Sequence, residues 1–98
     1  MIDLDRYINR TIDFKINGNL VKVQELTPKM FRKVSEYEST NENEIFDKQL
    51  ELVTEILNRN TSGVKFKRSE LEELPQSAIN KIYTEVVNFT REPLEDPN

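Results

Sequence analysis

The chain has 98 residues, with 18 acidic and 14 basic side chains and a formal net charge of −4, a length that fits one domain. It contains neither Cys nor His, which excludes disulfides, thiolate nucleophiles, Cys/His zinc sites and the usual general base near neutral pH. The acidic balance argues against a nucleic-acid binder, which needs a basic surface. No run approaches the roughly 18 apolar residues that a membrane span needs, so we expect a soluble, intracellular protein.

A short helix or an arm is predicted at residues 1–10, because Leu4, Tyr7 and Ile8 have helical spacing. A β-hairpin is predicted next, at about residues 11–26. Its first half alternates apolar and polar residues, which is the period-two pattern of a half-buried strand.

The turn of this hairpin is predicted at Asn17 and Gly18, a preferred type I′ pair because both positions need a positive φ. A two-residue loop places the apolar residues of both strands on one side, whereas a three-residue loop would set Phe14 against Lys22. The expected cross-strand pairs are Ile12 with Val23, Asp13 with Lys22 and Phe14 with Val21.

The chain beyond the hairpin reads mainly as helix. Thr27 can cap a helix and Pro28 suits its first position, and this helix should end in the polar stretch 39–43. The clearest helix is predicted at 44–59, where apolar residues fill an arc of roughly 160° at 100° per residue and only Gln49 intrudes.

The last third of the chain contains shorter signals. Val64–Lys67 is either a third strand or an extended connection, and Ser69–Glu72 fits a capping box that starts a helical turn. A final helix should start at Pro75 and end at about residue 90, followed by a disordered acidic tail at 91–98.

The predicted fold class is mainly α with an N-terminal β-hairpin. We expect a small α+β protein with a single domain at residues 1–90, in which three to four helices pack on the hairpin. A hairpin alone is marginal in water, so its apolar face must lie against these helices.

No catalytic, cofactor or metal site is predicted. Carboxylates cluster near residues 42–47 and 70–73, and a hard-cation site is the functional interpretation of such clusters. A solvated acidic face is favoured instead, because no calcium-loop spacing is present. Basic residues surround Phe66, which either stacks on a nucleic-acid base or packs inward from a strand whose Lys neighbours point outward; the acidic balance favours inward packing.

Wide apolar faces on the helices at 44–59 and 76–90 are the most informative feature. One interpretation is that the hairpin and the two helices cover these faces completely. The other is that part of each face binds another chain, since helix-in-groove recognition uses this spacing. The candidate partner-binding residues are Phe46, Leu50, Val53, Leu57, Ile82 and Val86.

Taken in order, the chain resembles the tail assembly chaperones of long-tailed bacteriophages that infect Gram-positive bacteria. The resemblance is carried by "FKINGNLVKVQELTPKMF" at residues 14–31, the acidic break at 39–44, the amphipathic middle helix, and "LEELPQSAINKIYTEVVN" at residues 71–88. It covers most of residues 11–90 and is a pattern of elements rather than one motif.

The resemblance implies a small, mainly helical protein that is not an enzyme. Proteins of that family bind the tape measure protein while the tail tube polymerises around it, and they recruit tail tube subunits. They act in the cytoplasm of the infected cell and are not retained in the virion. Many are also made in a longer, frameshifted form. The family has no catalytic residues to carry over.

Other functions remain open at this stage. The chain could be a small acidic phage inhibitor that mimics DNA, although Lys and Arg interrupt its carboxylates. It could also be a structural tail or neck component that stays in the particle. Self-association is expected in addition, because a domain of this size has a modest core.

Overall fold

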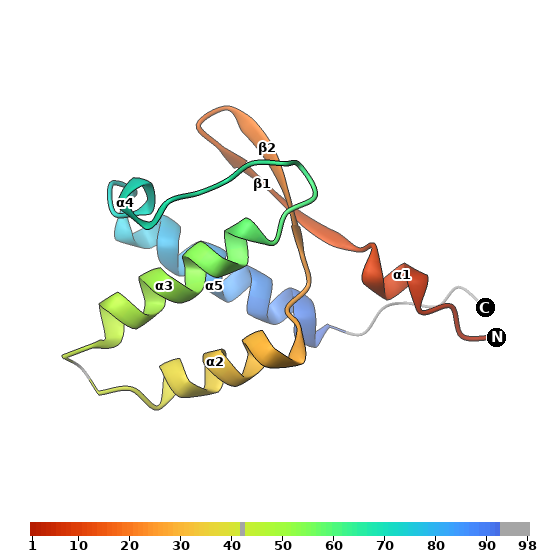
Figure 1. Cartoon of the computed structure of the whole chain (residues 1–98), viewed down its shortest axis with the longest axis horizontal. Coiled ribbons are helices and arrows are strands. Elements are labelled where there is room, and N and C mark those ends of the chain that lie inside the picture. Colours follow the sequence, from red (N-terminus) through yellow and green to blue (C-terminus); the bar gives the residue numbers. More distant parts are fainter. Residues whose placement is uncertain (42, 93–98) are drawn as a thin grey trace.

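The computed structural model describes residues 1–41 and 43–92. Within them the chain forms a short helix, a hairpin and four further helices (Figure 1). The elements are α1 (Asp5–Ile8), β1 (Thr11–Ile16), β2 (Asn19–Gln24), α2 (Pro28–Glu38), α3 (Ile45–Asn58), α4 (Arg68–Leu71) and α5 (Gln76–Arg91). The predicted fold class, mainly helical with an N-terminal hairpin, is confirmed.

The hairpin has the register that the sequence predicts. Phe14 lies opposite Val21, and the pairs Ile12–Val23 and Asp13–Lys22 also form. Asn17 has a φ of 52° and Gly18 a φ of 83°, so both turn positions adopt the left-handed conformation that the type I′ turn requires. The apolar residues of both strands therefore share one face, and Val21 and Val23 are fully buried on it.

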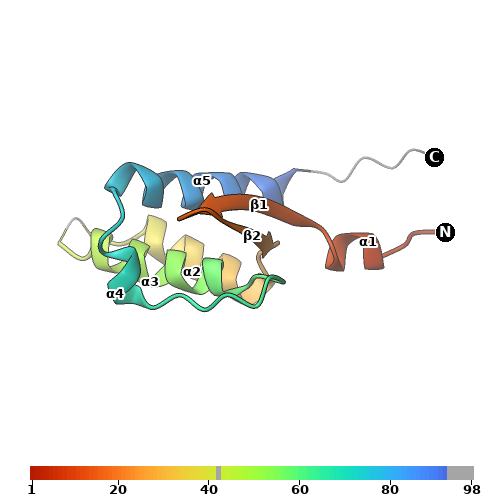
Figure 2. The same ribbon diagram turned by 90° about the horizontal axis from the view of Figure 1, so that it is seen from above.

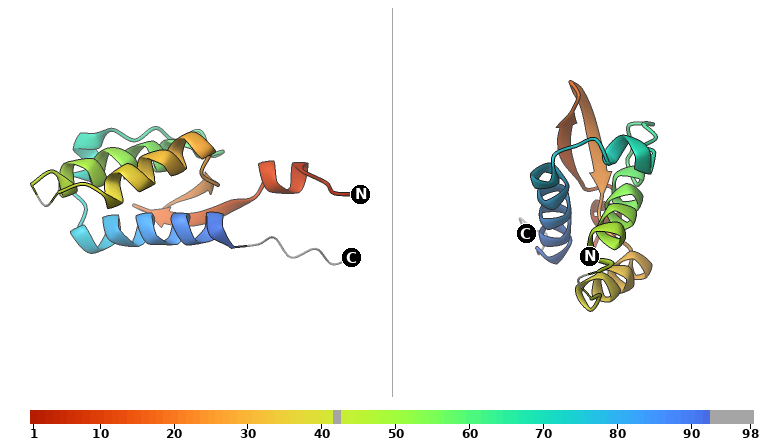
Figure 3. Two further views of the ribbon diagram at one scale, coloured as in Figure 1. Left: turned by 90° about the horizontal axis from the view of Figure 1, so that it is seen from below. Right: turned by 90° about the vertical axis from the view of Figure 1, so that its left-hand side faces the viewer.

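The hairpin lies between the two longest helices, α3 and α5. Figures 1 and 2 show α3 and α5 running in the same direction, with α2 antiparallel to α3. Seen end-on, α5 and α3 lie on opposite sides of the body and the hairpin rises between them (Figure 3). Thr27 caps α2 as predicted, since its hydroxyl oxygen accepts a hydrogen bond from the Met30 amide at 3.3 Å.

The core is formed by one face of each of these elements. Its fully or nearly fully buried apolar residues are Val21, Val23, Leu26, Met30, Val34, Leu52, Val53, Ile56, Leu57, Leu71, Ile79, Ile82, Val86 and Val87. Most come from β2, α3 and α5, so the hairpin and the two longest helices share a single apolar interior.

The connection between α3 and α4 is extended rather than a third strand. The Asn58 side chain makes hydrogen bonds to both polar backbone groups of Phe66. Its amide nitrogen donates to the Phe66 carbonyl at 3.0 Å, and its oxygen accepts from the Phe66 amide at 2.7 Å. Phe66 packs against the core while Lys65 and Lys67 are exposed, which confirms the inward-packing interpretation.

One predicted helix boundary is wrong. α4 begins at Arg68, with Lys67 at its N-cap and no side-chain cap, so Ser69 lies inside the helix and the capping box does not form. The last helix ends at Arg91 with Glu92 as its C-cap, close to the predicted end at about residue 90. Residues 93–98 of the predicted tail lie outside the described residues.

Residues 1–9 project from one end of the molecule, away from the helices, and we call them the arm (Figures 1 and 2). The arm contains α1, and none of the residues of α1 is buried.

Candidate partner-binding surface

The six predicted partner-binding residues do not share one surface. Val53, Leu57 and Val86 are fully buried and Ile82 is 5% exposed, so these four belong to the core and are not available to a partner in this structure. They are covered because α3 packs against both α5 and β2.

Phe46 and Leu50, on the first two turns of α3, differ from the other four. Phe46 is 67% exposed, and Leu50 is half-buried against the core. A single exposed apolar residue is common on protein surfaces, so Phe46 becomes a candidate contact site only together with the groove beside it.

A groove of about 210 Å³ lies beside Phe46, between the N-terminal halves of α3 and α5 and the short helix α4. We call it the α3–α5 groove. Its walls are mixed, with apolar side chains interspersed with carboxylates and amides. The lining residues are Phe46, Asp47, Gln49, Leu50, Leu71, Glu72, Leu74, Gln76 and Ile79.

Gln49 is the one buried polar residue of the described chain, at 5% exposure. Its side-chain nitrogen donates to the Asn80 oxygen at 2.7 Å, and its oxygen accepts a hydrogen bond from the Gln76 amide at 2.7 Å. These bonds join α3 to α5 at the floor of the groove. The residue that interrupts the apolar pattern of α3 thus fixes the spacing of the groove walls.

Arg68 controls the charge at the rim of the groove. Its guanidinium pairs with Asp47 at 2.8 Å, Glu51 at 3.3 Å and Glu72 at 3.5 Å. One cation among three carboxylates leaves this rim acidic. Arg68 is therefore not part of a basic patch with Lys65 and Lys67, because the carboxylates of Asp47, Glu51 and Glu72 compensate its charge.

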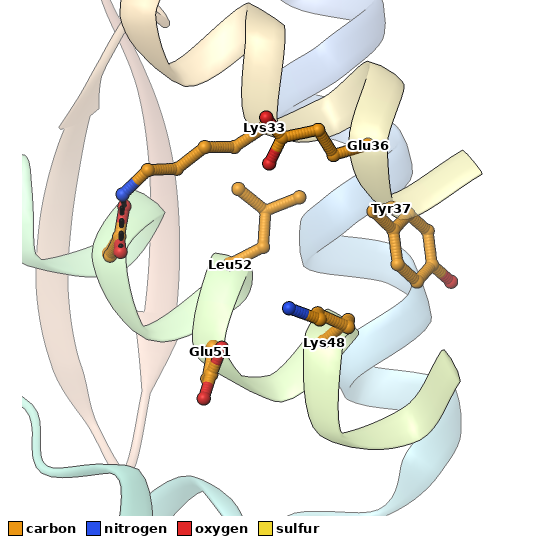
Figure 4. Close-up of a pocket in the computed structure, with 7 residues that line it drawn as sticks. Lys33, Glu36, Tyr37, Lys48, Glu51 and Leu52 are labelled. Carbon is orange, nitrogen blue, oxygen red and sulfur yellow. Dashed lines mark hydrogen bonds and ion pairs between the residues drawn. The ribbon is translucent and has the colours of Figure 1, made fainter. Parts of the chain in front are cut away.

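A second hollow, of about 150 Å³, lies between α2 and α3 (Figure 4). Leu52 lies at its centre and Lys33 reaches across it from α2 to pair with Glu55 of α3 at 2.8 Å. Lys48, Glu36 and Glu51 complete a wall of mixed charge. Because the wall carries both positive and negative charges, it favours neither cations nor anions.

Tyr37 borders this second hollow and packs edge-on against Tyr83, with ring centroids 5.0 Å apart. The Tyr83 hydroxyl donates to a Glu38 carboxylate oxygen at 3.1 Å. Burial, and then the Glu38 charge, raise the pKa of both tyrosines above the ordinary value of 10.0. Both phenols stay protonated near neutral pH, which makes them poor nucleophiles and bases.

The described acidic residues do not come together as a metal site, and Glu42 lies outside the described residues. Among residues 1–41 and 43–92, no group of three or more Asp or Glu side chains is arranged to hold a metal ion. In the same part of the chain, no helix has the length and apolar character needed to cross a membrane.

Several surface features were not visible in the sequence. Leu71, Leu74 and Ile79 line the α3–α5 groove, although their spacing alone indicates only helix and core. The arm carries further exposed apolar side chains, which the sequence marked only as a helical spacing.

Comparison of the chain with protein-family models, with curated proteins and with solved structures found no match.

Proposed function

We propose that this protein is a non-enzymatic tail assembly chaperone of a long-tailed bacteriophage of Gram-positive bacteria. In this proposal it binds the tape measure protein and recruits tail tube subunits in the cytoplasm of the infected cell, and it is not retained in the virion. The exposed Phe46 at the mouth of the α3–α5 groove is the observation that carries the proposal.

The shape of the groove suits a helical client. Its apolar side chains include Leu50, Leu71 and Leu74, on three different helical or connecting segments. An amphipathic helix that lays its apolar face into a groove uses anchors of this kind. Phe46, exposed beside the walls, supplies the large aromatic contact that dominates many interfaces.

The charge of the rim adds a preference. Asp47, Glu51 and Glu72 surround the single cation of Arg68. A client helix with Lys or Arg beside its apolar face would complement this rim, which favours encounter and orientation more than raw affinity.

The chemistry of the chain supports binding rather than catalysis. The sequence has no His or Cys, and the raised pKa values of Tyr37 and Tyr83 remove the phenols as bases near neutral pH. The DNA-mimic alternative gains nothing from the geometry, because Arg68 and Lys33 are interspersed among the carboxylates and interrupt the array of negative charges that mimicry needs.

Co-expression with fragments of the tape measure protein tests the proposal. The wild-type chain should keep a fragment soluble and co-purify with it, while Phe46→Ser should lose both effects and keep the helical circular dichroism signal. Leu20→Ser is the matched control, since Leu20 is 56% exposed on β2 and away from the groove.

Two outcomes would contradict the proposal. One is a wild-type chain that neither solubilises nor retains any fragment of the tape measure protein. The other is recovery of the protein from purified virions by mass spectrometry, which would favour the structural tail or neck component instead.

A further inference from the structure

The two edges of the hairpin have different neighbours. The outer edge of β2 is covered, because the chain that follows α3 runs beside it. The Gln24 amide donates to the Arg59 carbonyl at 2.8 Å, and the Lys22 carbonyl accepts from the Thr61 amide at 2.9 Å. The Lys22 amide also donates to the Ser62 hydroxyl at 3.0 Å. The free edge of this two-stranded sheet is therefore the outer edge of β1.

The backbone of β1 presents free hydrogen-bonding groups along this edge. Asp13 lies opposite Lys22, and Thr11 lies opposite Gln24. In an antiparallel pair, two opposite residues either bond to each other or both point away. Since Lys22 and Gln24 bond outward, Asp13 and Thr11 also point outward, and so does Lys15, two residues further along. In the described part of the chain, no other segment bonds to these outward groups of β1, so they can template a further strand.

β1 lacks several features that usually protect an edge strand. It is six residues long, contains no proline and pairs with β2 without a bulge. Its apolar side chains are also incompletely covered. Ile12, Phe14 and Ile16 are only half-buried, whereas Val21 and Val23 on β2 are fully buried. A strand added beside β1 would cover the exposed parts of these side chains.

A second groove, mainly apolar and of about 250 Å³, lies between β1 and α5. We call it the hairpin–α5 groove, because Phe14 and Ile16 of β1 and Ala78 and Ile82 of α5 line it; two lysines and an asparagine add polar groups. It is smaller than the roughly 300–1,000 Å³ of pockets for drug-sized ligands, so it suits individual side chains. α5 lies beyond β1, on the side away from β2, so this groove lies under the free edge (Figures 2 and 3).

Charges on the solvent-facing side of the edge restrict what can pair with it. Asp13 and Lys15 project on the side opposite to Phe14, since side chains alternate along a strand. Asp13 has Lys22 opposite it on β2, whereas Lys15 lies opposite Leu20. None of the ion pairs of the described residues involves Lys15. An added strand is therefore favoured if it places an acidic residue opposite Lys15.

A second copy of β1 does not fit this edge. Antiparallel pairing of two β1 strands about a two-fold axis would bring both α5 helices under the same two strands, because α5 lies beyond β1 (Figure 2). Neighbouring strands are about 4.8 Å apart, whereas packed helices need about 8–10 Å between their axes. The space beside β1 therefore admits one extended chain that lies over α5.

We propose that the free edge of β1 binds an extended segment of a partner protein as a third, antiparallel strand. Apolar residues at alternate positions of this segment fill the hairpin–α5 groove, and an acidic residue between them lies opposite Lys15. Backbone hydrogen bonds to Asp13 and Lys15 supply affinity, and the groove supplies specificity. This site does not include Phe46 and does not depend on the proposed function, although Leu74 borders both grooves.

A designed peptide of sequence TVEVKVT tests strand addition. Paired antiparallel to β1, it places its glutamate opposite Lys15, its lysine opposite Asp13 and its valines on the side of the groove. Hydrogen exchange followed by NMR should show that the peptide slows exchange of the Asp13 and Lys15 amides. The Phe14 amide, which faces β2, should be protected with and without the peptide.

Two N-methylated forms of the peptide are a matched pair. Methyl groups on the glutamate and lysine amides remove hydrogen bonds to β1 and should weaken binding by about tenfold or more. Methyl groups on two of the valine amides point away from β1 and should change binding by less than about threefold. Fluorescence anisotropy of the labelled peptides measures both affinities.

Variants of the protein separate the roles of backbone, groove and charge. Asp13→Pro removes an outward amide at a position where an edge strand tolerates proline, and it should lose peptide binding, whereas Asp13→Ala should keep it. Ala78→Glu places a charge in the groove and should also lose binding, with the helical circular dichroism signal unchanged. Lys15→Glu should weaken binding of TVEVKVT, and the peptide TVKVKVT should restore it.

Three results would overturn the proposal. TVEVKVT could fail to bind the wild type at millimolar concentration, or the two methylated peptides could bind equally well. The third is self-association of the wild type in analytical ultracentrifugation that Asp13→Pro abolishes, because a second copy of the chain would then occupy the edge.

Discussion

The two ends of α3 follow the same apolar pattern but have opposite environments. At the C-terminal end, Val53 and Leu57 are completely buried, whereas Phe46 at the N-terminal end is 67% exposed. β2 contacts the C-terminal end of α3, where the Gln24 amide donates to the Arg59 carbonyl at 2.8 Å, whereas the N-terminal half of α3 borders the α3–α5 groove. Periodicity therefore identifies which face of a helix is apolar, and the neighbouring elements decide how far along the helix that face is covered.

The largest expected effect comes from breaking the covered end. Leu57→Ala should lower the free energy of unfolding by about 2–4 kcal/mol, because it leaves a cavity in a fully packed site. Phe46→Ala should change it by less than about 0.5 kcal/mol, since the ring is mostly in solvent. Urea denaturation measures both. Leu20→Ala, the same chemical change at an exposed site, serves as the control, and equal losses for Leu57→Ala and Phe46→Ala would contradict the difference between the two ends.

The second effect concerns Gln49, which lies where the covered and uncovered ends meet. Gln49→Ala should cost about 1–2 kcal/mol, because it removes two hydrogen bonds to α5 and leaves a small cavity. Ser77→Ala is the control and should cost less than about 0.5 kcal/mol, since Ser77 is exposed on the same helix and takes no part in this network. A Gln49→Ala variant as stable as the wild type would show that this network does not hold α3 against α5.

A smaller effect on stability is expected at the rim of the α3–α5 groove, beside the N-terminal end of α3. Arg68→Ala should cost less than about 1 kcal/mol, since its three ion pairs are solvent-exposed. The difference from the wild type should shrink at high salt, where such pairs are screened. Urea denaturation at low and high salt checks this. A salt-independent loss above about 2 kcal/mol would mean that Arg68 contributes mainly by packing.

The smallest effect is a pH dependence where α2 meets α5. The pKa of Tyr83 is raised in the folded protein by burial and by Glu38. Its contribution to stability is therefore complete below about pH 10, where the unfolded chain still holds the proton, and is lost as the pH rises above that value. Tyr83→Phe should make the fall in melting temperature above about pH 10 shallower. Tyr7→Phe on the exposed arm is the control, and identical profiles for Tyr83→Phe and the wild type would contradict the assignment.

The elements and the hairpin were largely predictable because their signals are local. The Asn17–Gly18 turn sets the register of β1 and β2 within a few residues, and Thr27 caps α2 from the adjacent position. A local signal can also mislead. Ser69 is a good capping residue, yet α4 starts at Arg68 with Lys67 at its N-cap and no side-chain cap.

The candidate site was predictable only in part. Phe46 and Leu50 remain predicted partner-binding residues at the surface, and the structure places the other four named residues in the core. Their burial depends on α5 and β2, which are distant along the chain. The role of Gln49 had a weak signal, one polar residue in an apolar face, but its partners could not be inferred.

The sequence by itself determined which segments are helical or extended, which side of each is apolar, and which catalytic chemistries are missing. Tertiary structure decided which apolar residues stay in solvent, because that depends on contacts between distant segments. Gln49 and Asn80, for example, are 31 residues apart and meet at the floor of the α3–α5 groove. The two grooves and the exposed arm exist only once the helices and the hairpin are placed relative to one another.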